Sequence, residues 1–503
     1  MSIARVLTVQ PHVLAGTIVV IEADISRGLH AFSIVGLAGK AIDESKDRVS
    51  SAIKHSGFDS PKTKNHKIVI SLSPADLKKE GPLFDLPIAL AYLSAAQEIL
   101  VDEKERVYVG ELGLDGSIKK VRGVLNCVLA ARAAGFEEII VPADNAEEAA
   151  LVDGITIHPA NTLHEVIEHI RSGEEKRTLP TQPPTHIAQD WYESAITLED
   201  IKGQETAKRG LIIAAAGRHN VMFVGPPGTG KTMLARALRG LLPPLSREEA
   251  LAVTAIHSIA GSDVEISARP PFRSPHHTAS HTALVGGGAN PKPGEVTLAH
   301  HGVLFMDEFP EFERRSIDAL RQPLEDRVVT ISRVQGSAEF PADFILVAAL
   351  NPYRGSEDGT TDLARAMKET YKNKVSGPIL DRIDLWLEVP HVDYDTLTSL
   401  KVETGETEKA REQVRKARER MLARHAGRLS TTNSNLSARD IEEIIYLSDE
   451  VKNILKISSL KLNLSPRSYH RLIKVARTIA DLDEQEHIGI PHILEALQYR
   501  VPL

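Results

Sequence analysis

The sequence predicts an α/β fold in which a parallel sheet follows a mixed N-terminal domain and precedes a helical C-terminal region. Three apolar runs each lead into a polar segment: Val221–Val224 precedes a glycine-rich loop, Val303–Met306 precedes two acids, and Phe344–Ala348 precedes Asn351. Helical patterns separate these runs. Strands that alternate with helices and end in polar loops indicate a parallel, doubly wound sheet, with functional residues at the carboxyl ends of the strands.

Changes in residue pattern predict several domains, as expected for a chain of 503 residues. Residues 1–172 combine short β-branched runs with helical patterns and predict a domain of strands and helices. Residues 173–193 are polar, contain prolines and lack periodicity, which is typical of an interdomain linker. Residues 194–391 hold the predicted sheet, and residues 392–503 show the helical patterns of a C-terminal lid.

The composition is that of a soluble globular protein, with 42% hydrophobic and 25% charged residues. No apolar run approaches the roughly 20 residues needed to cross a bilayer, and the N-terminal residues lack the pattern of a signal peptide. The single cysteine, Cys127, excludes an internal disulfide and a cysteine-based zinc site. We therefore expect a cytoplasmic protein that contacts no membrane.

The net charge of −8 excludes the overall basic excess of a simple nucleic-acid coat protein. Any contact with nucleic acid must therefore be local. The strongest local candidate is the stretch Lys409–Arg428, in which Lys and Arg far outnumber the acids Glu412 and Glu419. The same stretch is equally typical of a solvated basic helix.

A glycine-rich loop follows the first apolar run, matches the pattern G-x-x-x-x-G-K-[ST] and precedes a helical segment. In such loops the backbone N–H groups surround phosphate oxygens, the lysine reaches the β- and γ-phosphates, and the final hydroxyl holds Mg²⁺. The sequence therefore predicts a site for ATP and Mg²⁺. It is built from Gly225, Pro226, Pro227, Gly228, Thr229, Gly230, Lys231 and Thr232.

Acidic and amide side chains follow the next two apolar runs. Asp307 is placed to hold Mg²⁺ through water together with Thr232, and Glu308 to polarise the attacking water. Asn351 reaches the same sheet edge, where an amide can orient that water. An acidic turn, or an Asn before Pro, is often only a turn feature, but the upstream glycine loop favours the catalytic interpretation.

Five long segments carry a family resemblance. They are DIKGQETAKRGLIIAAAGRHN at Asp200–Asn220, RSPHHTASHTALVGGG at Arg273–Gly288, PKPGEVTLAHHGVLFMDE at Pro291–Glu308, SGPILDRID at Ser376–Asp384 and LSPRSYHRLIKVARTIADL at Leu464–Leu482. These segments resemble the ComM/YifB branch of the Mg-chelatase-like AAA+ ATPases, which is linked to bacterial DNA transformation. Because residues 1–172 also fit, the resemblance covers essentially the whole chain.

The resemblance implies roles for residues outside the glycine loop. It makes Arg382 an arginine finger that enters the ATP site of a neighbouring subunit, and Arg467 a sensor arginine that reaches the phosphates from the lid. It therefore implies a ring, most simply a homo-hexamer. A guanidinium beside the γ-phosphate offsets the charge that develops during phosphoryl transfer. The stretch from Ile201 to Gln204 is expected to lie against the adenine.

Two further segments resemble elements that point into the pore of a family ring. His257–Leu298 resembles the family's helix-2 insert, and Val328–Phe340 resembles its presensor hairpin. In a ring of this kind, basic side chains on these segments are candidates for contacts with the DNA backbone. These side chains are Arg269, Arg273, Lys292 and Arg333.

No zinc site is expected. The histidines of the central region do not form a spaced pair with supporting carboxylates; they are His276, His277, His281, His300 and His301. Members of the resembled family usually carry a cysteine cluster after the Asn-Pro pair, but here Asn351-Pro352 runs into YRGSEDGTTDLARAMKET without a cysteine. The structural metal of such a cluster is therefore not expected.

The N-terminal domain resembles the Lon-protease-type fold through KKEGPLFDLPIA and GELGLDGSIKKVRGVLNCVLAARAAG. The position that matches the protease's nucleophilic Ser is Leu83, and the position that matches its Lys is Leu125. Without a hydroxyl nucleophile and an amine base, this route to peptide cleavage is closed. The domain is expected to be a structural or DNA-binding collar.

Three functions are compatible with this pattern. The resemblance favours a ring-forming, ATP-driven DNA translocase or branch-migration helicase that acts in recombination and natural transformation. The ATPase subunit of a metal chelatase is the alternative, and the fused Lon-like domain speaks against it. A scaffold that binds ATP only to assemble is disfavoured, because Lys231, Asp307, Glu308, Asn351 and Arg382 are all present.

Overall fold

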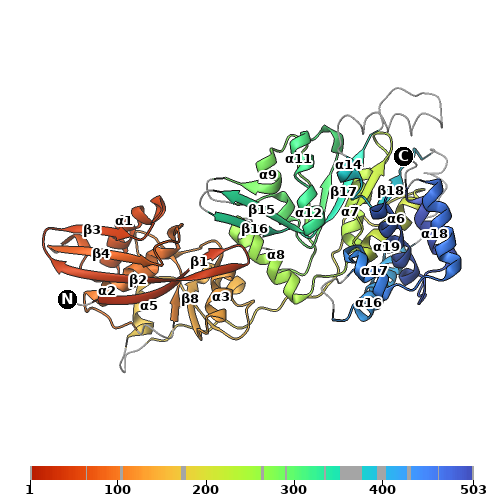
Figure 1. The fold of residues 1–503 in the computed structure, drawn as a ribbon. Coiled ribbons are helices and arrows are strands. Elements are labelled where there is room, and N and C mark those ends of the chain that lie inside the picture. Colours follow the sequence, from red (N-terminus) through yellow and green to blue (C-terminus); the bar gives the residue numbers. More distant parts are fainter. Residues whose placement is uncertain are drawn as a thin grey trace. The chain divides into compact units, whose positions relative to one another are not determined.

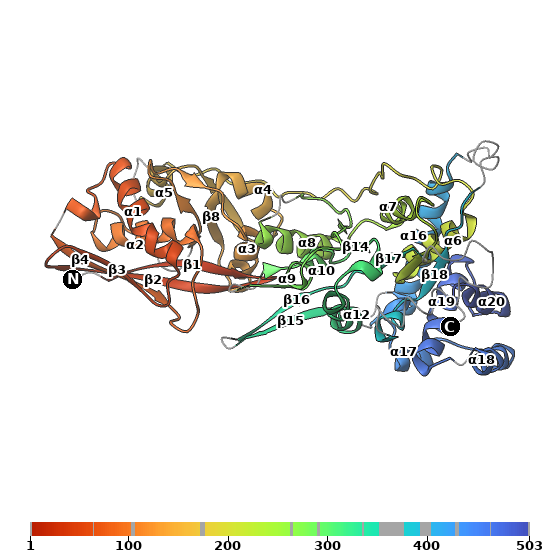
Figure 2. The same ribbon diagram turned by 90° about the horizontal axis from the view of Figure 1, so that it is seen from above.

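The described residues of the computed structural model form two compact units (Figure 1; Figure 2). Unit 1 comprises Met1–Ala188 and Ala250–Ser267, and unit 2 comprises Gln189–Glu249 and Ala268–Leu503. The main division falls within the stretch 173–193 that the sequence predicts to be a linker. The structure describes residues 3–63, 65–101, 106–171, 177–261, 265–288, 292–333, 336–351, 377–392, 404–427, 432–462 and 464–500.

Unit 1 is built on a seven-stranded mixed sheet with the strand order β3-β4-β2-β1-β5-β8-β9. The long strands β1 and β2 pair antiparallel, whereas β5, β8 and β9 continue the sheet in parallel. The strands are β1 (Ile3–His12), β2 (Ala15–Arg27), β3 (Ala31–Val35), β4 (His66–Ser73), β5 (Arg106–Tyr108), β8 (Glu138–Pro142) and β9 (Thr156–Ala160), with a small pair β6 (Glu111–Leu112) and β7 (Ile118–Lys119).

Two apolar helices form the centre of unit 1. Helices α2 (Asp85–Ala95) and α3 (Val124–Ala133) pack against β1 and β2. The unit also contains α1 (Lys40–His55), α4 (Ala146–Ala149) and α5 (Leu163–Ile170). Leu83 is 4% exposed and Leu125 is fully buried, so both side chains, which the resemblance aligns with the protease's nucleophile and base, lie in the apolar core of unit 1. The absence of the dyad stays a prediction of that resemblance.

Most of helix α8 (Arg247–Ala260) belongs to unit 1. Ala255 lies in the apolar core of that unit. The Ser258 hydroxyl accepts a hydrogen bond from the Gly123 backbone N–H at 2.9 Å and donates one to the buried carboxylate of Glu148. From the sequence, this segment is expected in the parallel-sheet domain, with the insert beginning at His257. The structure groups residues 250–267 with unit 1, because their apolar and hydroxyl side chains complete its core.

The described part of the predicted linker divides between the units, with residues 177–188 in unit 1 and 189–193 in unit 2. In unit 1, the Gln182 and Thr185 N–H groups donate to the carbonyl oxygens of Ile157 and Ala150, each at 2.9 Å. In unit 2, the Arg239 guanidinium stacks over the Tyr192 ring at 3.8 Å. Each part of this polar, aperiodic sequence therefore makes contacts within its own unit.

Unit 2 contains the predicted parallel sheet, with the strand order β11-β14-β17-β10-β18 and parallel pairing throughout. The three inner strands are fully buried because each carries an uninterrupted apolar run. The strands are β10 (Val221–Val224), β11 (Phe272–Arg273), β14 (Val303–Met306), β17 (Ile345–Leu350) and β18 (Leu385–Glu388); helices α6 (Glu205–Gly217) and α7 (Lys231–Leu241) flank β10 in sequence.

The C-terminal region is helical, as predicted. Helix α19 is strongly amphipathic and lies against α6, α16 and α20. Buried Asp481 near its end pairs with Arg424 and Arg477. The helices are α16 (Glu406–Arg424), α17 (Ala438–Ile444), α18 (Asp449–Lys461), α19 (Pro466–Leu482) and α20 (Ile490–Gln498).

Short elements complete unit 2. The antiparallel hairpin of β15 (Val328–Arg333) and β16 (Gly336–Pro341) confirms the predicted hairpin. The others are β12 (Gly286–Gly287), β13 (Lys292–Pro293), α9 (His281–Val285), α10 (Glu295–Leu298), α11 (Arg314–Asp318), α12 (Arg321–Asp326) and α14 (Gly377–Leu380). Among the helices of the described residues, none has the length and apolar composition to cross a membrane.

Candidate functional site: a nucleotide site and a separate arginine cavity

The glycine loop leaves strand β10, which lies between β17 and β18. Gly225 has no room for a side chain, since a Cβ there would lie 2.1 Å from the Val389 carbonyl oxygen. Gly228 and Gly230 have positive φ angles of 81° and 89°, which residues with a Cβ rarely adopt. The glycines therefore fix the path of the loop into α7. No side chain caps that helix, so its first N–H groups can receive an anion.

Lys231 and Thr232 begin helix α7 beside the end of the next strand. The Lys231 Nζ donates to the carbonyl oxygens of Gly225 at 2.9 Å and Pro226 at 2.6 Å. Burial lowers the pKa of Lys231, although the charge of Asp307 opposes this shift. The Thr232 Oγ1 donates to Asp307 Oδ2 at 3.2 Å. The lysine, hydroxyl and carboxylate predicted to meet are thus in one place.

Strand β14 delivers two carboxylates to the same edge of the sheet. The Glu308 backbone N–H donates to Asp307 Oδ1 at 2.9 Å. Glu308 has a φ of 50°, a left-handed conformation that is uncommon for a residue with a side chain and is enriched at functional sites. Its Oε2 lies 3.3 Å from the Nδ1 of His277. The candidate catalytic acid therefore contacts a histidine of the predicted insert.

Asn351 follows β17, which pairs in parallel with β10 and β14. The register aligns Val224 with Leu350 and Met306 with Ala348. This brings Asn351 to the edge that carries the glycine loop and the two acids. Its Oδ1 is buried and makes no hydrogen bond with the part of the chain that the structure describes. That oxygen can therefore accept a hydrogen bond from a water molecule.

The residues at this edge fit a complex of ATP and Mg²⁺. Gly228 and Gly230 have open space where a Cβ would stand, Lys231 is bonded to loop carbonyls, and the Asn351 oxygen lacks a described partner. Thr232 and Asp307 supply the oxygen ligands that Mg²⁺ prefers. When bound, Mg²⁺ would neutralise charge that develops on the phosphates. The individual catalytic roles stay predictions.

Ile201 lies four residues before helix α6, and Gln204 is the N-cap residue of that helix. They are 6% and 5% exposed, and the Gln204 Nε2 donates to the Pro390 carbonyl oxygen at 2.8 Å. Ile201 packs in the apolar core of unit 2. The structure thus gives both residues protein partners, and their contact with adenine stays a prediction.

Arg382 and Arg467 lie side by side in a cavity of about 690 Å³. Both pair with the carboxylate of Glu325, and the Arg382 Nη1 also donates to the Pro378 carbonyl oxygen at 2.6 Å. None of the glycine-loop residues 225–232, all of which the structure describes, lines this cavity. The resemblance placed Arg382 in the neighbour's site and Arg467 over the phosphates. Within one chain the structure brings both side chains to the carboxylate of Glu325, and their roles at the phosphates stay predictions.

Asn220, directly before β10, is bonded both to the segment that carries Arg382 and to the neighbouring strand β17. Its Nδ2 donates to the Arg382 carbonyl oxygen at 3.0 Å, and its Oδ1 accepts from the Leu346 N–H at 2.8 Å. The Asn220 N–H donates to Asp384 Oδ2 at 3.2 Å. The segment that carries Arg382 is therefore bonded directly to the beginning of β10 and to β17.

The predicted DNA-contacting cations have different environments. Arg273 makes a two-fold ion pair with Glu295, with N–O distances of 2.6 and 2.8 Å, so its donors are largely engaged. The Arg269 guanidinium lies 5.8 Å from the Tyr192 ring centre. Lys292 is exposed on β13. The side chain of Arg333 lies outside the described residues. Arg269 and Lys292 are thus both exposed, whereas Arg273 is partly buried and engaged by Glu295.

Helix α16, which holds most of the basic stretch Lys409–Arg428, uses several of its cations within the fold. Arg415 pairs with Glu412 and Glu419, at 2.6 and 2.5 Å. The Arg418 Nη2 donates to the Ala215 carbonyl oxygen, and burial lowers the pKa of Arg418 to about 9. These contacts support the structural interpretation of the stretch over a DNA-binding one.

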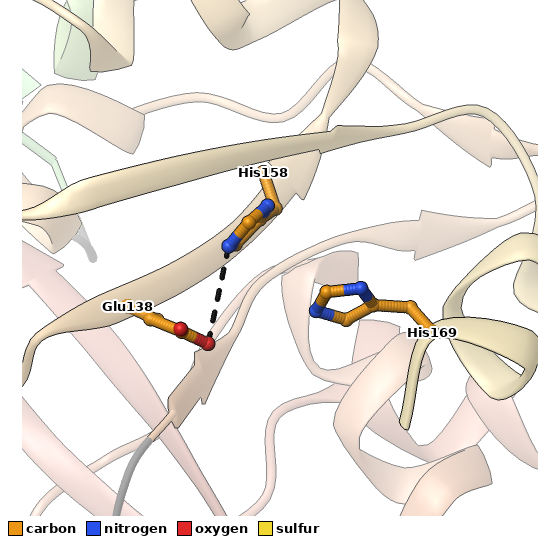
Figure 3. A group of neighbouring side chains, drawn as sticks. All are labelled: Glu138, His158 and His169. Atoms are coloured by element: carbon orange, nitrogen blue, oxygen red, sulfur yellow. Dashed lines mark ion pairs between the residues drawn. The ribbon is translucent and has the colours of Figure 1, made fainter. Parts of the chain in front are cut away.

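A cluster that the sequence analysis did not identify lies in unit 1 (Figure 3). Ligand atoms of Glu138, His158 and His169 lie within 4.8 Å of one another. The His169 Nδ1 accepts from the Leu179 N–H at 3.0 Å, so the neutral ring carries its hydrogen on Nε2, which then cannot bind a metal. His158 Nδ1 lies 3.2 Å from the Pro180 carbonyl oxygen. The two histidines therefore hold linker residues 179 and 180.

The sequence analysis missed His277 as a partner of Glu308 and Glu325 as a partner of the two arginines. His277 lies in the quoted segment RSPHHTASH, but only its position near the carboxyl edge of the sheet connects it with Glu308. Glu325 lies 57 residues before Arg382 and 142 residues before Arg467 in sequence. No local pattern could have linked these three side chains.

Three family models match the chain. "Magnesium chelatase, subunit ChlI" matches residues 197–397, "Subunit ChlI of Mg-chelatase" matches residues 21–145, and "Magnesium chelatase, subunit ChlI C-terminal" matches residues 404–500. The AAA+ ATPases of this type bind ATP and Mg²⁺.

Two curated relatives cover nearly the whole chain, and a third covers less than a third of it. Competence protein ComM of Haemophilus influenzae is 43% identical, over 99% of this chain and 98% of its own length. YifB of Escherichia coli is 42% identical over 96% of this chain and 94% of its own length. Lon protease 2 of Bacillus subtilis is 33% identical over 30% of this chain and 32% of its own length. The chain therefore belongs to the ComM/YifB family of Mg-chelatase-like AAA+ ATPases.

Proposed function

We propose that this protein is a ring-forming, ATP-driven DNA translocase or branch-migration helicase that acts in the cytoplasm in recombination and natural transformation. The main support for a ring is that the predicted catalytic residues lie in two separate places. Lys231, Asp307 and Glu308 stand at the sheet edge, whereas Arg382 and Arg467 share another cavity. A second subunit that offers its arginines to this edge would complete the site, as in a homo-hexamer.

In this proposal each subunit performs two tasks. Its glycine loop and Lys231 bind the phosphates, Thr232 and Asp307 hold Mg²⁺, and Glu308 accepts a proton from the attacking water while Asn351 orients that water. Its Arg382, together with Arg467, offsets negative charge on the phosphates held by the next subunit. Because each ATP site needs residues of two subunits, hydrolysis in one site can depend on the position of the neighbouring subunit.

The DNA part of the proposal is supported by the family and by exposed charge. The relative from Haemophilus influenzae is named a competence protein, and its match extends over both units. Lys292 on the predicted insert is exposed. The alternative, the ATPase subunit of a metal chelatase, is favoured by the names of the matching families. The Lon-like unit and the full-length match to the competence protein favour DNA.

The test of this proposal is the rate of ATP hydrolysis without DNA and with single-stranded, duplex and four-way-junction DNA. We expect DNA to raise the rate, because a translocase couples hydrolysis to contact with its track. A rate that is insensitive to all three DNA forms in assembled protein would contradict the DNA substrate and favour the chelatase alternative.

Replacing His277 with Ala is expected to raise basal hydrolysis about fivefold and to reduce the additional stimulation by DNA. The His277 Nδ1 lies 3.3 Å from the Glu308 carboxylate, and an exposed ion pair of this kind contributes up to about 1 kcal/mol. Its loss frees the carboxylate to reach the attacking water. The control is His276→Ala, because the His276 ring bonds to Thr278 instead. Equal hydrolysis in the two variants, with and without DNA, would show that the His277 contact does not restrain Glu308.

Lys292→Ala is expected to weaken DNA binding and to lower the slope of log affinity against log salt by about one, since one phosphate contact is lost. The control is Arg415→Ala, which removes an exposed cation already paired with two acids. Fluorescence anisotropy over a series of salt concentrations measures both slopes. An unchanged slope in the Lys292 variant would remove this side chain from the DNA path.

A further inference from the structure

One carboxylate holds the two candidate trans-acting arginines. Glu325, near the end of α12, accepts from Arg382 Nη2 with one oxygen and from Arg467 Nη2 with the other. Arg382 follows α14, and Arg467 lies in the first turn of α19. Glu325 therefore connects three elements that are distant in sequence.

The cavity around Glu325 holds several further charged groups. Arg471 and Lys474 line it together with the two arginines, and so do the acids Asp343, Asp381 and Asp384. Burial lowers the pKa of Arg471, to which the charges of Arg467 and Arg382 contribute in the same direction. Burial would raise the pKa of Glu325, but hydrogen bonds and charges from Arg382 and Arg467 hold it below its usual value. The carboxylate is thus anionic and offsets repulsion between neighbouring guanidinium groups.

Each arginine keeps donors for a further partner. A guanidinium has five N–H donors, and each of these two gives one of them to Glu325. Glu325 can therefore orient both side chains without occupying all of their donors.

We infer that Glu325 is a positioning residue for ATP hydrolysis, which holds Arg382 and Arg467 together as one unit for the phosphates of the neighbouring subunit. This inference rests on the proposed function, because it requires the arginines to act in trans. Removal of the negative charge leaves two guanidinium groups that repel each other and separate. The site of the neighbour then loses both, although its own glycine loop is unchanged.

Glu325→Gln keeps the size of the side chain and removes its charge. We expect ATP binding and KM to change little and kcat to fall about 10- to 100-fold, the loss that corresponds to one or two charge-assisted hydrogen bonds. The matched control is Asp326→Asn, which neutralises the adjacent exposed carboxylate of α12 and is expected to keep the parental rate. Glu325→Asp keeps the negative charge on a side chain that is one methylene group shorter. We expect its kcat to lie between those of Glu325→Gln and the parental protein.

Mixed rings separate positioning from a general loss of structure. Glu325→Gln subunits keep an intact glycine loop, so mixing them with Lys231→Ala subunits, which keep both arginines and Glu325, should restore hydrolysis. Mixing them with Arg382→Ala subunits should not, since both variants lack the same half of the site. A reference mixture of Arg382→Ala with Lys231→Ala is run in parallel.

Recovery with Arg382→Ala, or parental hydrolysis by Glu325→Gln alone, would overturn the inference. If Glu325→Gln loses its cooperative unfolding transition, Glu325→Asp enters the same mixtures, and an Asp variant that recovers with Arg382→Ala overturns it equally. Failure of the reference mixture itself, with co-assembly verified, would reject the trans arginine and the inference together. If the reference mixture regains hydrolysis but Glu325→Gln subunits recover with Arg382→Ala subunits, only the inference about Glu325 is rejected.

Discussion

Arg382→Ala is expected to bind ATP nearly normally and to lose about 10³- to 10⁵-fold in hydrolysis rate, the range that arginine fingers contribute in related phosphoryl-transfer sites. Binding is spared because Arg382 lines a cavity to which the glycine loop of its own subunit does not contribute. Nucleotide affinity measured with a fluorescent ATP analogue and a steady-state hydrolysis assay separate the two effects. General destabilisation would lower both.

The arrangement in trans gives this prediction a second part. Arg382→Ala subunits keep the glycine loop, and Lys231→Ala subunits keep the arginines, so mixed rings should regain hydrolysis at interfaces where each supplies the missing half. Neither variant has this activity alone. A mixture that stays at the sum of its inactive parts, despite verified co-assembly, would make Arg382 a structural partner of Glu325 instead.

Lys231→Ala is expected to abolish nucleotide binding, whereas Glu308→Gln is expected to bind ATP and lose hydrolysis. The lysine contacts phosphates in the ground state, and its loss leaves a buried site without its cation. The Glu308 carboxylate acts on water, so the isosteric amide removes the proton acceptor and keeps the fold. Equilibrium binding with single-turnover hydrolysis measures both. Parental hydrolysis by Glu308→Gln would refute its assignment as the acid that activates water.

Local chemistry explains why much of the nucleotide site is visible in the sequence. Gly225 is required by the close carbonyl of Val389, and the apolar runs before Lys231, Asp307 and Asn351 identify the buried strands. Parallel strands bring their carboxyl ends to one edge. Recognising the three strands as parallel neighbours is therefore enough to predict that Lys231, Asp307 and Asn351 lie at one edge of the sheet.

Contacts between distant elements could not be predicted in this way. The pairing of Arg382 and Arg467 on Glu325 depends on how α12, α14 and α19 pack. As a basic residue in the predicted insert, Arg273 is a candidate for a DNA contact, but its guanidinium is paired with Glu295. Helix α8 follows the glycine-loop helix in sequence and still completes the core of unit 1, because packing of its Ala255 face decides its place.

The central claim is that ATP hydrolysis drives this protein along DNA, and movement of a branched junction tests it most directly. A four-way junction with a fluorophore and a quencher on separate arms reports strand separation as the branch moves. We predict a signal increase that requires ATP with the parental protein and is absent with Glu308→Gln, although that variant still binds ATP and the junction. Junction movement by Glu308→Gln at the parental rate, or no movement by a parental protein that hydrolyses ATP on the junction, would contradict the account.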